Sequence, residues 1–311
     1  MRNAFAEEMT KVAATDKRVV VLSGDIGNRL FDKLRVVDAS RFYNCGVAEA
    51  NMMGVAAGMA LSGLRPFVYT ITPFTTTRCF EQIRVDVCYH HAPVVIIGTG
   101  SGLSYAELGP THHSLEDMAI LRTLPGMRVL APCDSSELRQ ALHEVLKDDS
   151  PTYIRIGKKG EADIHKSLPD LKLGKALVIR SGTDVALLCA GNMMAETLKT
   201  ADELAAKGVS AEVVSFHTVK PLDAEYLQQA AKRFKLLVTV EEHSRIGGFG
   251  SAVAEWRMAQ PDNVRQLSFG TDDEFMHEIG SQVYARKKYG LTADNMSTRT
   301  LAALAAVIPR P

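Results

Sequence analysis

The sequence predicts an α/β protein with two αβα domains, each built around a largely parallel sheet. Short apolar runs alternate with segments of helical periodicity along the chain. This alternation stops over residues 158–174, where charge, proline and glycine accumulate. The chain of 311 residues is long enough for two domains of about 150 residues each. We therefore expect a first domain over residues 1–157, a linker over 158–174 and a second domain over 175–311.

The first domain is expected to open with a helix and to continue with strands and helices in alternation. The opening helix carries one apolar stripe, formed by Phe5, Met9, Val12 and Ala13. Apolar runs that predict strands occupy residues 19–23, 66–72, 94–99, 128–132 and 152–156. Helices are expected over about 48–62 and 75–90, and another from Ser114. Asp134 and Glu137 have the spacing of a capping box, which predicts a helix start at that point.

The second domain repeats the alternation of strands and helices. Apolar runs at 185–190, 211–216 and 236–242 predict three further strands. Between the first two lies a predicted helix with one apolar face, formed by Met194, Leu198, Ala201 and Ala205. A glycine-rich turn at 246–250 follows the third strand.

Composition and charge argue against several classes of protein. The chain has 36 basic and 36 acidic residues, so it lacks the basic excess of nucleic-acid binders and membrane-surface proteins. No apolar run reaches the roughly 18 residues of a membrane-spanning helix, and the opening residues do not resemble a signal peptide. The five cysteines are scattered and form no CxxC pair, which argues against a disulfide framework or a zinc site. We expect a cytoplasmic protein with reduced thiols and no metal ligands of its own.

Glu49 is the most informative single residue, because it is the only charged side chain between Arg41 and Arg65. With so few polar neighbours its carboxylate is expected to be buried, and burial raises the pKa of a carboxyl group. Buried carboxylates are costly unless they are paired, so they often serve a function. The alternative is a helix-start glutamate with its head in solvent. The helix also has a flat face of small residues, formed by Ala50, Gly54, Gly58 and Ser62.

A second informative stretch is the glycine-rich loop that follows the predicted strand at 94–99. Its end, GPTHH, places Pro110 just before Thr111, His112 and His113. Loops at the carboxyl ends of parallel strands are where α/β sheets bind ligands, and an imidazole there can exchange protons with a substrate oxygen. The alternative is that Ser114 caps a helix and that the histidines have no chemical role.

Together these stretches resemble the transketolase family of thiamine-diphosphate enzymes. GVAEANMMGVAAGMA (46–60) is similar to the segment with the catalytic glutamate of the pyrimidine-binding domain. GPTHHSLEDMAILRTLPGMRVLAPCDSSE (109–137) resembles a run shared by transketolases and deoxyxylulose-phosphate synthases. TVKPLD (218–223) and VTVEEHSRIGGFGSAVAE (238–255) resemble the C-terminal transketolase domain. The resemblance covers nearly the whole chain and implies thiamine diphosphate as the cofactor.

The resemblance also implies that half of the enzyme lies elsewhere. Complete transketolases begin with a diphosphate-binding domain, whose GDG…N motif holds Mg²⁺ against the cofactor. In this sequence the only similar string, SGDIGN (23–28), matches the start of the pyrimidine domain instead. We therefore expect the C-terminal subunit of a split transketolase, inactive without an N-terminal subunit that binds the Mg²⁺. The expected assembly is α₂β₂, with self-association through the helix that carries Gly54 and Gly58.

Family roles pass to individual residues only where the motifs match. Glu49 matches the glutamate that bonds the N1′ nitrogen of the aminopyrimidine and activates the cofactor. His112 matches the histidine of GPTH, which contacts a substrate oxygen. Asp25, in SGDIG, matches an aspartate near the cofactor and the subunit interface.

Other parts of the expected site are less closely matched. Phe74 is predicted to be the aromatic that packs on the pyrimidine ring, with Ile71 or Tyr69 as the alternatives if the register shifts by a few residues. Two positions depart from the usual transketolase loop: Leu108 replaces an aspartate that contacts a donor hydroxyl, and Gly100 replaces a histidine. These losses are expected to weaken binding of ordinary sugar-phosphate donors.

Four cationic residues are candidates for binding an anionic end of the substrate: Lys158, Arg29, Arg2 and Arg155. Lys158 lies near the position of a phosphate-binding arginine of the family. Each of the four has surface charge as its alternative interpretation.

The resemblance implies transfer of a two-carbon ketol unit from a ketose or ketose phosphate to an aldose. Two other functions are alternatives to ketol transfer. The first is a subunit that decarboxylates an oxo acid, like deoxyxylulose-phosphate synthase or the β subunit of a 2-oxo acid dehydrogenase. The second is a scaffold paralogue without activity.

Overall fold

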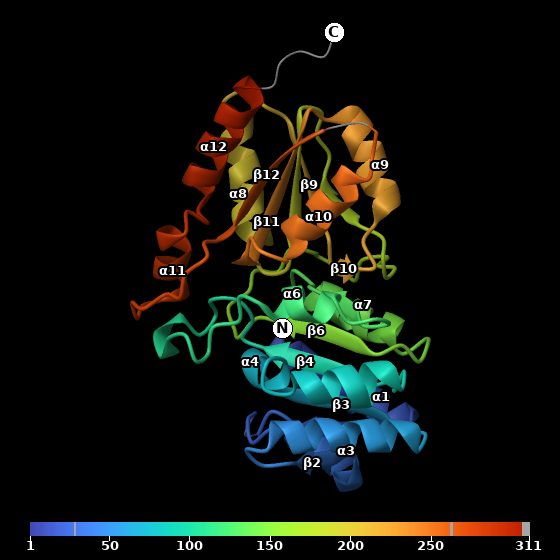
Figure 1. Ribbon diagram of the computed structural model, residues 1–311. Helices are drawn as coiled ribbons and strands as arrows, with labels where there is room; N and C mark the ends of the chain where they lie inside the picture. The colour runs from blue at the N-terminus through green and yellow to red at the C-terminus, as the bar shows by residue number, and fades with distance from the viewer. Residues whose placement is uncertain (28, 262–263, 307–311) are drawn as a thin grey trace.

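The computed structural model describes residues 1–27, 29–261 and 264–306 and has the predicted α/β architecture. Two αβα domains lie end to end, with the N-terminal half below the C-terminal half in Figure 1. Asn28, at the end of the SGDIGN segment, and residues 307–311 of the predicted second domain lie outside the described residues. None of the helices within the described residues has the length and apolarity needed to cross a bilayer.

The first sheet has seven strands in the order β10-β5-β6-β4-β3-β1-β2. They are β1 (Val19–Ser23), β2 (Phe42–Asn44), β3 (Arg65–Ile71), β4 (Val95–Thr99), β5 (Arg128–Leu130), β6 (Thr152–Ile156) and β10 (Thr218–Lys220). All neighbours pair in parallel except β10, which runs antiparallel to β5. Strands β1, β4 and β6 are buried along their whole length, because helices cover both faces of the sheet.

The helices around the first sheet divide between its two faces. They are α1 (Arg2–Thr15), α2 (Asp32–Val37), α3 (Glu49–Leu61), α4 (Thr72–Thr75), α5 (Phe80–Gln82), α6 (Asp117–Arg122) and α7 (Ser135–Val145), with the short helices η1 (Ala39–Arg41), η2 (Ile83–Tyr89) and η3 (Ala106–Leu108). Phe5 and Met9 of α1 belong to the core on one face, and Met52 of α3 belongs to the core on the other. This second core continues into the other domain through Leu188 and Phe216, so the domains share buried apolar contacts.

Two predicted helices of this domain have different bounds in the structure. The helix expected over 75–90 is divided into α4, α5 and the π-helix η2. The hydroxyls of Thr75 and Thr76 both donate to the carbonyl of Thr72, which competes with regular helical bonding. The helix expected from Ser114 begins at Asp117, because Ser114 pairs with Gly102 in a β-bridge.

The helix start predicted at Asp134 is confirmed, with the return bond of Glu137 going to the amide of Cys133 instead of the Asp134 amide. Asp134 Oδ1 accepts from the amide of Glu137 at 2.8 Å, and Glu137 Oε2 accepts from the amide of Cys133 at 2.7 Å. These bonds satisfy amide groups at the start of α7 that have no partner within the helix.

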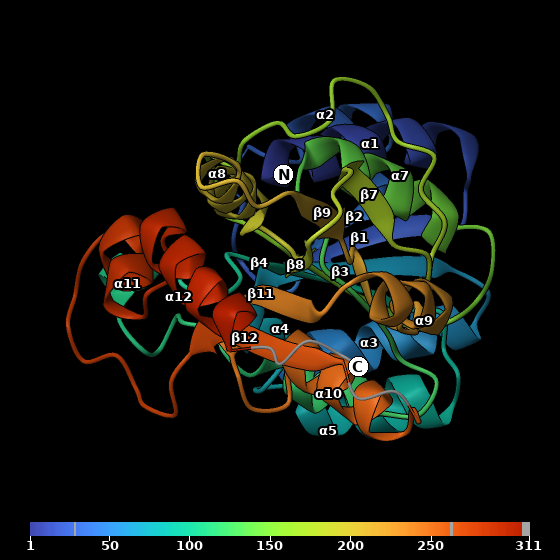
Figure 2. The same ribbon diagram turned by 90° about the horizontal axis from the view of Figure 1, so that it is seen from above.

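The second sheet has five strands in the order β12-β11-β8-β9-β7. They are β7 (Leu177–Arg180), β8 (Val185–Ala190), β9 (Ala211–Ser215), β11 (Leu236–Ser244) and β12 (Arg265–Thr271), with β7 antiparallel to β9. The helices are α8 (Met194–Ala205), α9 (Ala224–Arg233), α10 (Phe249–Met258), α11 (Gln282–Lys288) and α12 (Ala293–Ala305). Figure 2 shows α8 and α12 on one face of the sheet and α9 and α10 on the other.

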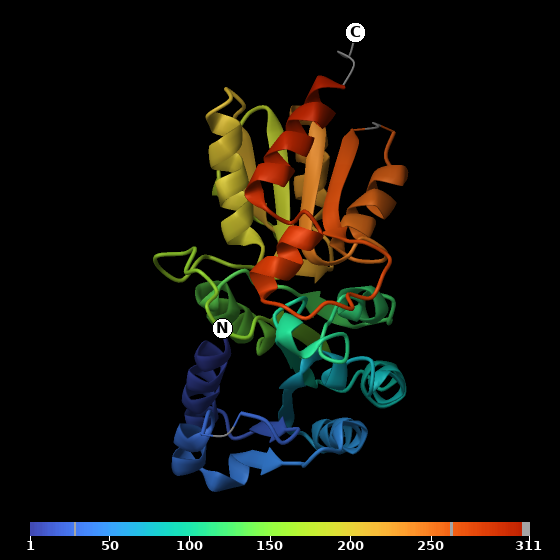
Figure 3. The same ribbon diagram turned by 90° about the vertical axis from the view of Figure 1, so that its left-hand side faces the viewer.

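Strand β10 crosses the boundary between the domains. Residues 158–174 contain no helix or strand and connect β6 to β7. Strand β10 follows β9 in the chain, yet it joins the edge of the first sheet, where Thr218 pairs with Leu130. Figure 3 shows the two domains stacked on one another, and the buried core of one continues into the other. The domain limits at 157/158 and 174/175 stay a prediction.

His217, just before β10, predicts a specific pH dependence of stability. Its side chain is buried, and burial lowers its pKa from 6.5 to about 4. Between these values the unfolded chain binds a proton that the folded chain does not, so stability falls as the pH falls below 6.5. We expect His217→Gln to reduce this acid loss by up to about 1.4 kcal/mol per pH unit. The measurement is urea denaturation of both proteins between pH 7.5 and 5, and parallel curves would contradict the prediction.

Candidate functional site

The predicted site lies where the carboxyl ends of β1, β3 and β4 meet at one edge of the first sheet. These strands are neighbours and run in parallel, so the segments after Ser23, Ile71 and Thr99 come close together. This edge is where open α/β sheets bind ligands. Helix α3 begins beside it, with Glu49 as its first residue.

The predicted burial of Glu49 is confirmed, since only 3% of the residue is exposed. A Cβ atom placed on Gly24 would lie 3.3 Å from Glu49 Cγ and 3.1 Å from Thr70 Cβ. The backbone after β1 therefore packs directly on the glutamate side chain. The alternative, a carboxylate with its head in solvent, is wrong.

Arg78 is the partner of this carboxylate, and it is not among the site residues predicted from the sequence. Arg78 Nη1 donates to Glu49 Oε2 at 2.7 Å, and its guanidinium carbon lies 4.2 Å from the centre of the Phe74 ring. The Arg78 side chain is 45% exposed, whereas Glu49 is almost fully enclosed. Because a buried charge is normally paired, the predicted burial of Glu49 also predicts a cation beside it. The sequence does not indicate which basic residue that is.

Phe74 and His112 lie together beside this ion pair. Their ring centres are 5.3 Å apart in an edge-to-face arrangement. On its other side His112 approaches Tyr105, with ring centres 6.0 Å apart. Lys158 Nζ lies 4.3 Å from the centre of the Tyr105 ring and forms an ion pair with Glu107. Tyr105 is a second residue of the site that was not predicted from the sequence.

The structure thus places four predicted residues along one line of contacts: Glu49, Phe74, His112 and Lys158. Arg78 and Tyr105 fill the intervals between them. Burial lowers the pKa of His112 below its ordinary value, so the ring is neutral near pH 7. A neutral imidazole has one donor and one acceptor nitrogen, which suits it to a hydroxyl or carbonyl of a substrate.

The two departures in the loop have different structural settings. Gly100 has φ of +73°, and a Cβ atom there would lie 2.0 Å from Tyr105 Cε2. The Tyr105 ring therefore occupies the space that a side chain at position 100 would need. Leu108 is 48% exposed and presents an apolar side chain just before Gly109.

The other predicted residues at this end of the domain lie on neighbouring segments. Asp25 is exposed, with φ of +55°, and accepts a hydrogen bond from Asn44 Nδ2 at 2.9 Å. Arg29 is exposed and lines a cavity of about 350 Å³ between the β1–α2 loop and β2. Arg2 is the first residue of α1, and Ile71 is the last residue of β3.

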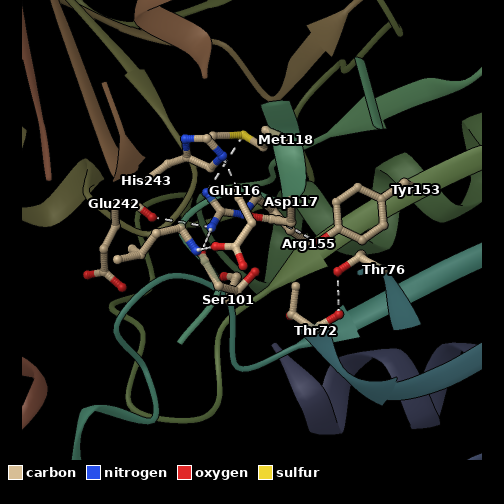
Figure 4. A network of polar contacts seen from close by, with 12 residues as sticks. Thr72, Thr76, Ser101, Glu116, Asp117, Met118, Tyr153, Arg155, Glu242 and His243 are labelled. Atoms are coloured by element: carbon tan, nitrogen blue, oxygen red, sulfur yellow. Dashed lines mark hydrogen bonds and ion pairs between the residues drawn. The ribbon is translucent and has the colours of Figure 1, made fainter. Parts of the chain in front are cut away.

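Arg155 lies in a different setting, at the centre of the buried polar network in Figure 4. Its Nε lies 3.0 Å from Asp117 Oδ2, which also accepts from the hydroxyl of Tyr153 at 2.6 Å. Its Nη2 donates to the carbonyls of Ser114 and Glu242, both at 3.2 Å. These contacts use its donors inside the protein, in contrast to the accessible cation that the prediction assumed.

The residues at the strand ends suit the pyrimidine half of thiamine diphosphate. An enclosed carboxylate at Glu49 can hold a ring nitrogen, and the half-buried Phe74 offers an aromatic face. Among the described residues, the group of His, Cys and carboxylate side chains close enough to share a metal ion is Cys133, Glu137 and His165. It lies at the start of α7 and in the segment before β7, and it does not include Glu49. The expected Mg²⁺ site in a partner subunit stays a prediction.

Comparison with protein families covers most of the chain. Residues 1–160 match the pyrimidine-binding domain of transketolase, and residues 174–296 match the transketolase C-terminal domain.

Curated relatives include proteins named as transketolase subunits. The chain is 38% identical over 294 residues to the 6-deoxy-6-sulfo-D-fructose transketolase subunit of Clostridium sp. (strain MSTE9), covering 94% of this chain and 91% of that one. It is 33% identical to an apulose-4-phosphate transketolase subunit of Phocaeicola vulgatus, covering 96% of both chains. It is also 35% identical to the 1-deoxy-D-xylulose-5-phosphate synthase of Methylacidiphilum infernorum, of which it spans 47%.

Solved structures of transketolases resemble the chain in fold. A split-gene transketolase, described as an inactive β₄ tetramer, superposes with a TM-score of 0.89 at 32% identity and covers 99% of this chain and 98% of its own. The transketolase of Campylobacter jejuni shares the fold, with a TM-score of 0.79 at 19% identity over 97% of this chain and 46% of its own.

Proposed function

The chain belongs to the transketolase family, and from that premise we propose that it transfers a two-carbon ketol unit from a ketose to an aldose as the C-terminal subunit of a split enzyme. The observation that carries this proposal is the line of contacts from Glu49 through Phe74 to His112 and Lys158. This line connects Glu49, which suits the cofactor, with His112 and Lys158, which suit a substrate.

The proposed cofactor is thiamine diphosphate, which supplies the electron sink for cleaving a C–C bond beside a carbonyl. Glu49 would hold the pyrimidine N1′ through its carboxyl group and share a proton with it. Phe74, or Ile71 in the alternative register, would pack on the ring. Asp25 would lie near the cofactor and the subunit interface. The enclosure of Glu49 supports its role, because proton sharing is stronger away from water.

The substrate end of the site would lie around His112. Its neutral ring would donate a hydrogen bond to, or accept one from, an oxygen of the ketose. Lys158, on the far side of Tyr105, would bind an anionic end of the substrate in exchange for Glu107. Arg29 and Arg2 remain further candidates for that role, whereas Arg155 is enclosed in the buried polar network. Relatives named for a sulfonated ketose and a ketose phosphate support an anionic donor.

The proposed partner is an N-terminal subunit with the GDG…N motif, which would bind the diphosphate and Mg²⁺. Helix α3 supports self-association, because Gly58 is exposed on its outer face and a Cβ atom there would meet nothing within 4 Å. The proposed assembly is α₂β₂. Similarity to deoxyxylulose-phosphate synthases keeps decarboxylation of an oxo acid as the second candidate function.

Coexpression with a transketolase N-terminal subunit tests this proposal. We expect an α₂β₂ species by sedimentation and ketol transfer from an anionic ketose to an aldose that depends on thiamine diphosphate and Mg²⁺. The same assembly is assayed with pyruvate in place of the ketose. Activity with pyruvate alone would favour the second candidate, and activity of the isolated 33.9 kDa chain would contradict the split enzyme.

A further inference from the structure

The loop that carries His112 is attached to the second domain through the side chain of Glu242. This glutamate lies on β11 and is fully buried. Its Oε1 accepts a hydrogen bond from the amide of Leu103 at 2.7 Å. The contact is close because Gly102 has φ of +63°, and a Cβ atom there would lie 2.5 Å from Glu242 Oε1. A first-domain loop thus packs directly on a second-domain carboxylate.

Helix α11 holds the same carboxylate from the other side. Gln282 Nε2 donates to both carboxylate oxygens, at 2.9 and 3.1 Å, and Arg286 Nε forms an ion pair with Oε2. Gln282 Nε2 also lies 3.3 Å from Ser104 Oγ, within the loop itself. A buried carboxylate with partners on both sides has one stable position, because each movement would leave a donor or the charge unpaired.

The base of the loop is held by separate contacts. Gly102 and Ser114 exchange two backbone bonds, at 3.1 and 3.0 Å, which close the segment between them. Arg155 Nη2 donates to the carbonyls of Ser114 and Glu242, so it bridges the loop and β11 (Figure 4). The amide of Ser244 donates to the carbonyl of Leu115 at 2.8 Å. Residues 102–115 are therefore attached to the second domain at both ends.

We propose that Glu242 is a positioning residue for the loop over residues 102–115, the substrate loop. From the second domain, together with α11, it sets the alignment of Tyr105 and His112 at the site. This inference rests on the proposed function of His112. The second domain, which contributes none of the predicted site residues, then acts on the reaction through this carboxylate. A displacement of about 1 Å at a reacting group can lower the rate about 10²-fold.

Glu242→Gln in the reconstituted assembly tests the proposal. Glutamine keeps the size of the side chain and one acceptor for the Leu103 amide. It removes the negative charge that pairs with Arg286, and its NH₂ group would face the NH₂ group of Gln282, so that two donors meet. We expect faster amide hydrogen exchange in a peptide covering residues 101–114 and a fall of about tenfold or more in kcat/KM. Exchange in α3, and the apparent affinity for thiamine diphosphate, should stay unchanged.

Glu255→Gln is the matched control, because Glu255 also forms an ion pair between the domains, with Arg122, but on the surface. Its removal should change neither loop exchange nor kcat/KM. If Glu242→Gln does not fold, Arg286→Lys gives the same test with the charge retained and the geometry changed.

The outcomes separate this proposal from the proposed function. Unchanged loop exchange in a folded variant would overturn the attachment, and faster exchange with unchanged kcat/KM would overturn its role in positioning. If the assembly with the natural chain showed no ketol transfer at all, the proposed function would be overturned. Faster loop exchange in Glu242→Gln would then still support the attachment of the loop.

Discussion

Glu49→Gln should abolish most turnover of the reconstituted assembly while leaving the affinity for thiamine diphosphate largely intact. Glutamine keeps the shape and a hydrogen bond, but it cannot share a proton with the cofactor ring. Such acid–base steps contribute about 10²–10⁴-fold, so kcat should fall by that factor. The fold should tolerate the change, because Arg78, which loses its ionic partner, is 45% exposed and can turn to solvent.

Exchange of the C2 proton of the bound cofactor, followed by NMR after deuterium labelling, measures this step directly. The matched control is Glu81→Gln, since Glu81 is an exposed carboxylate on the nearby helix α5 and pairs with Arg84. The control should exchange at the normal rate. If Glu49→Gln did the same, Glu49 would serve only as the ion-pair partner of Arg78, and its role in the proposed function would be wrong.

Much of the fold could be predicted from the sequence because the buried strands are short, apolar and regularly spaced. The runs at 19–23 and 152–156 match β1 and β6 residue for residue. β10 could not be predicted from its own three residues, because a short edge strand has too few side chains to show a pattern. Its place depends on pairing with β5, a contact far away in the sequence.

The candidate site was predictable to the extent that single residues stand out from their neighbours. Glu49 is the sole charge in a long apolar segment, so its burial followed from composition. Arg78 lies 29 residues further on, in a stretch where threonine hydroxyls interrupt the helix, so helical spacing could not place it near Glu49. Tyr105 could not be predicted because a glycine-rich loop has no periodicity, and its ring lies against Gly100, where a side chain would have no room.

Gly100→Ala should lower kcat/KM of the assembly by about tenfold or more, because it displaces the Tyr105 ring that lies against His112. The sequence alone suggests that a histidine at position 100 would restore the usual transketolase loop. The structure predicts that a histidine there would disrupt the loop, since even a Cβ atom at position 100 would lie 2.0 Å from Tyr105 Cε2. The positive φ adds about 1–2 kcal/mol for a residue other than glycine.

A double-mutant cycle with Tyr105→Gly separates these two effects. Gly100→Ala combined with Tyr105→Gly removes the clash and keeps only the cost of the positive φ. Tyr105→Gly should therefore lower kcat/KM less in the Gly100→Ala variant than it does in the natural chain. The matched control is Gly208→Ala, where φ is +79° and a Cβ atom would meet nothing within 4 Å. That control carries the backbone cost without the clash, and kcat/KM should stay near its normal value. Equal activity of Gly100→Ala and Gly208→Ala would show that the Tyr105 ring does not set the shape of the substrate loop.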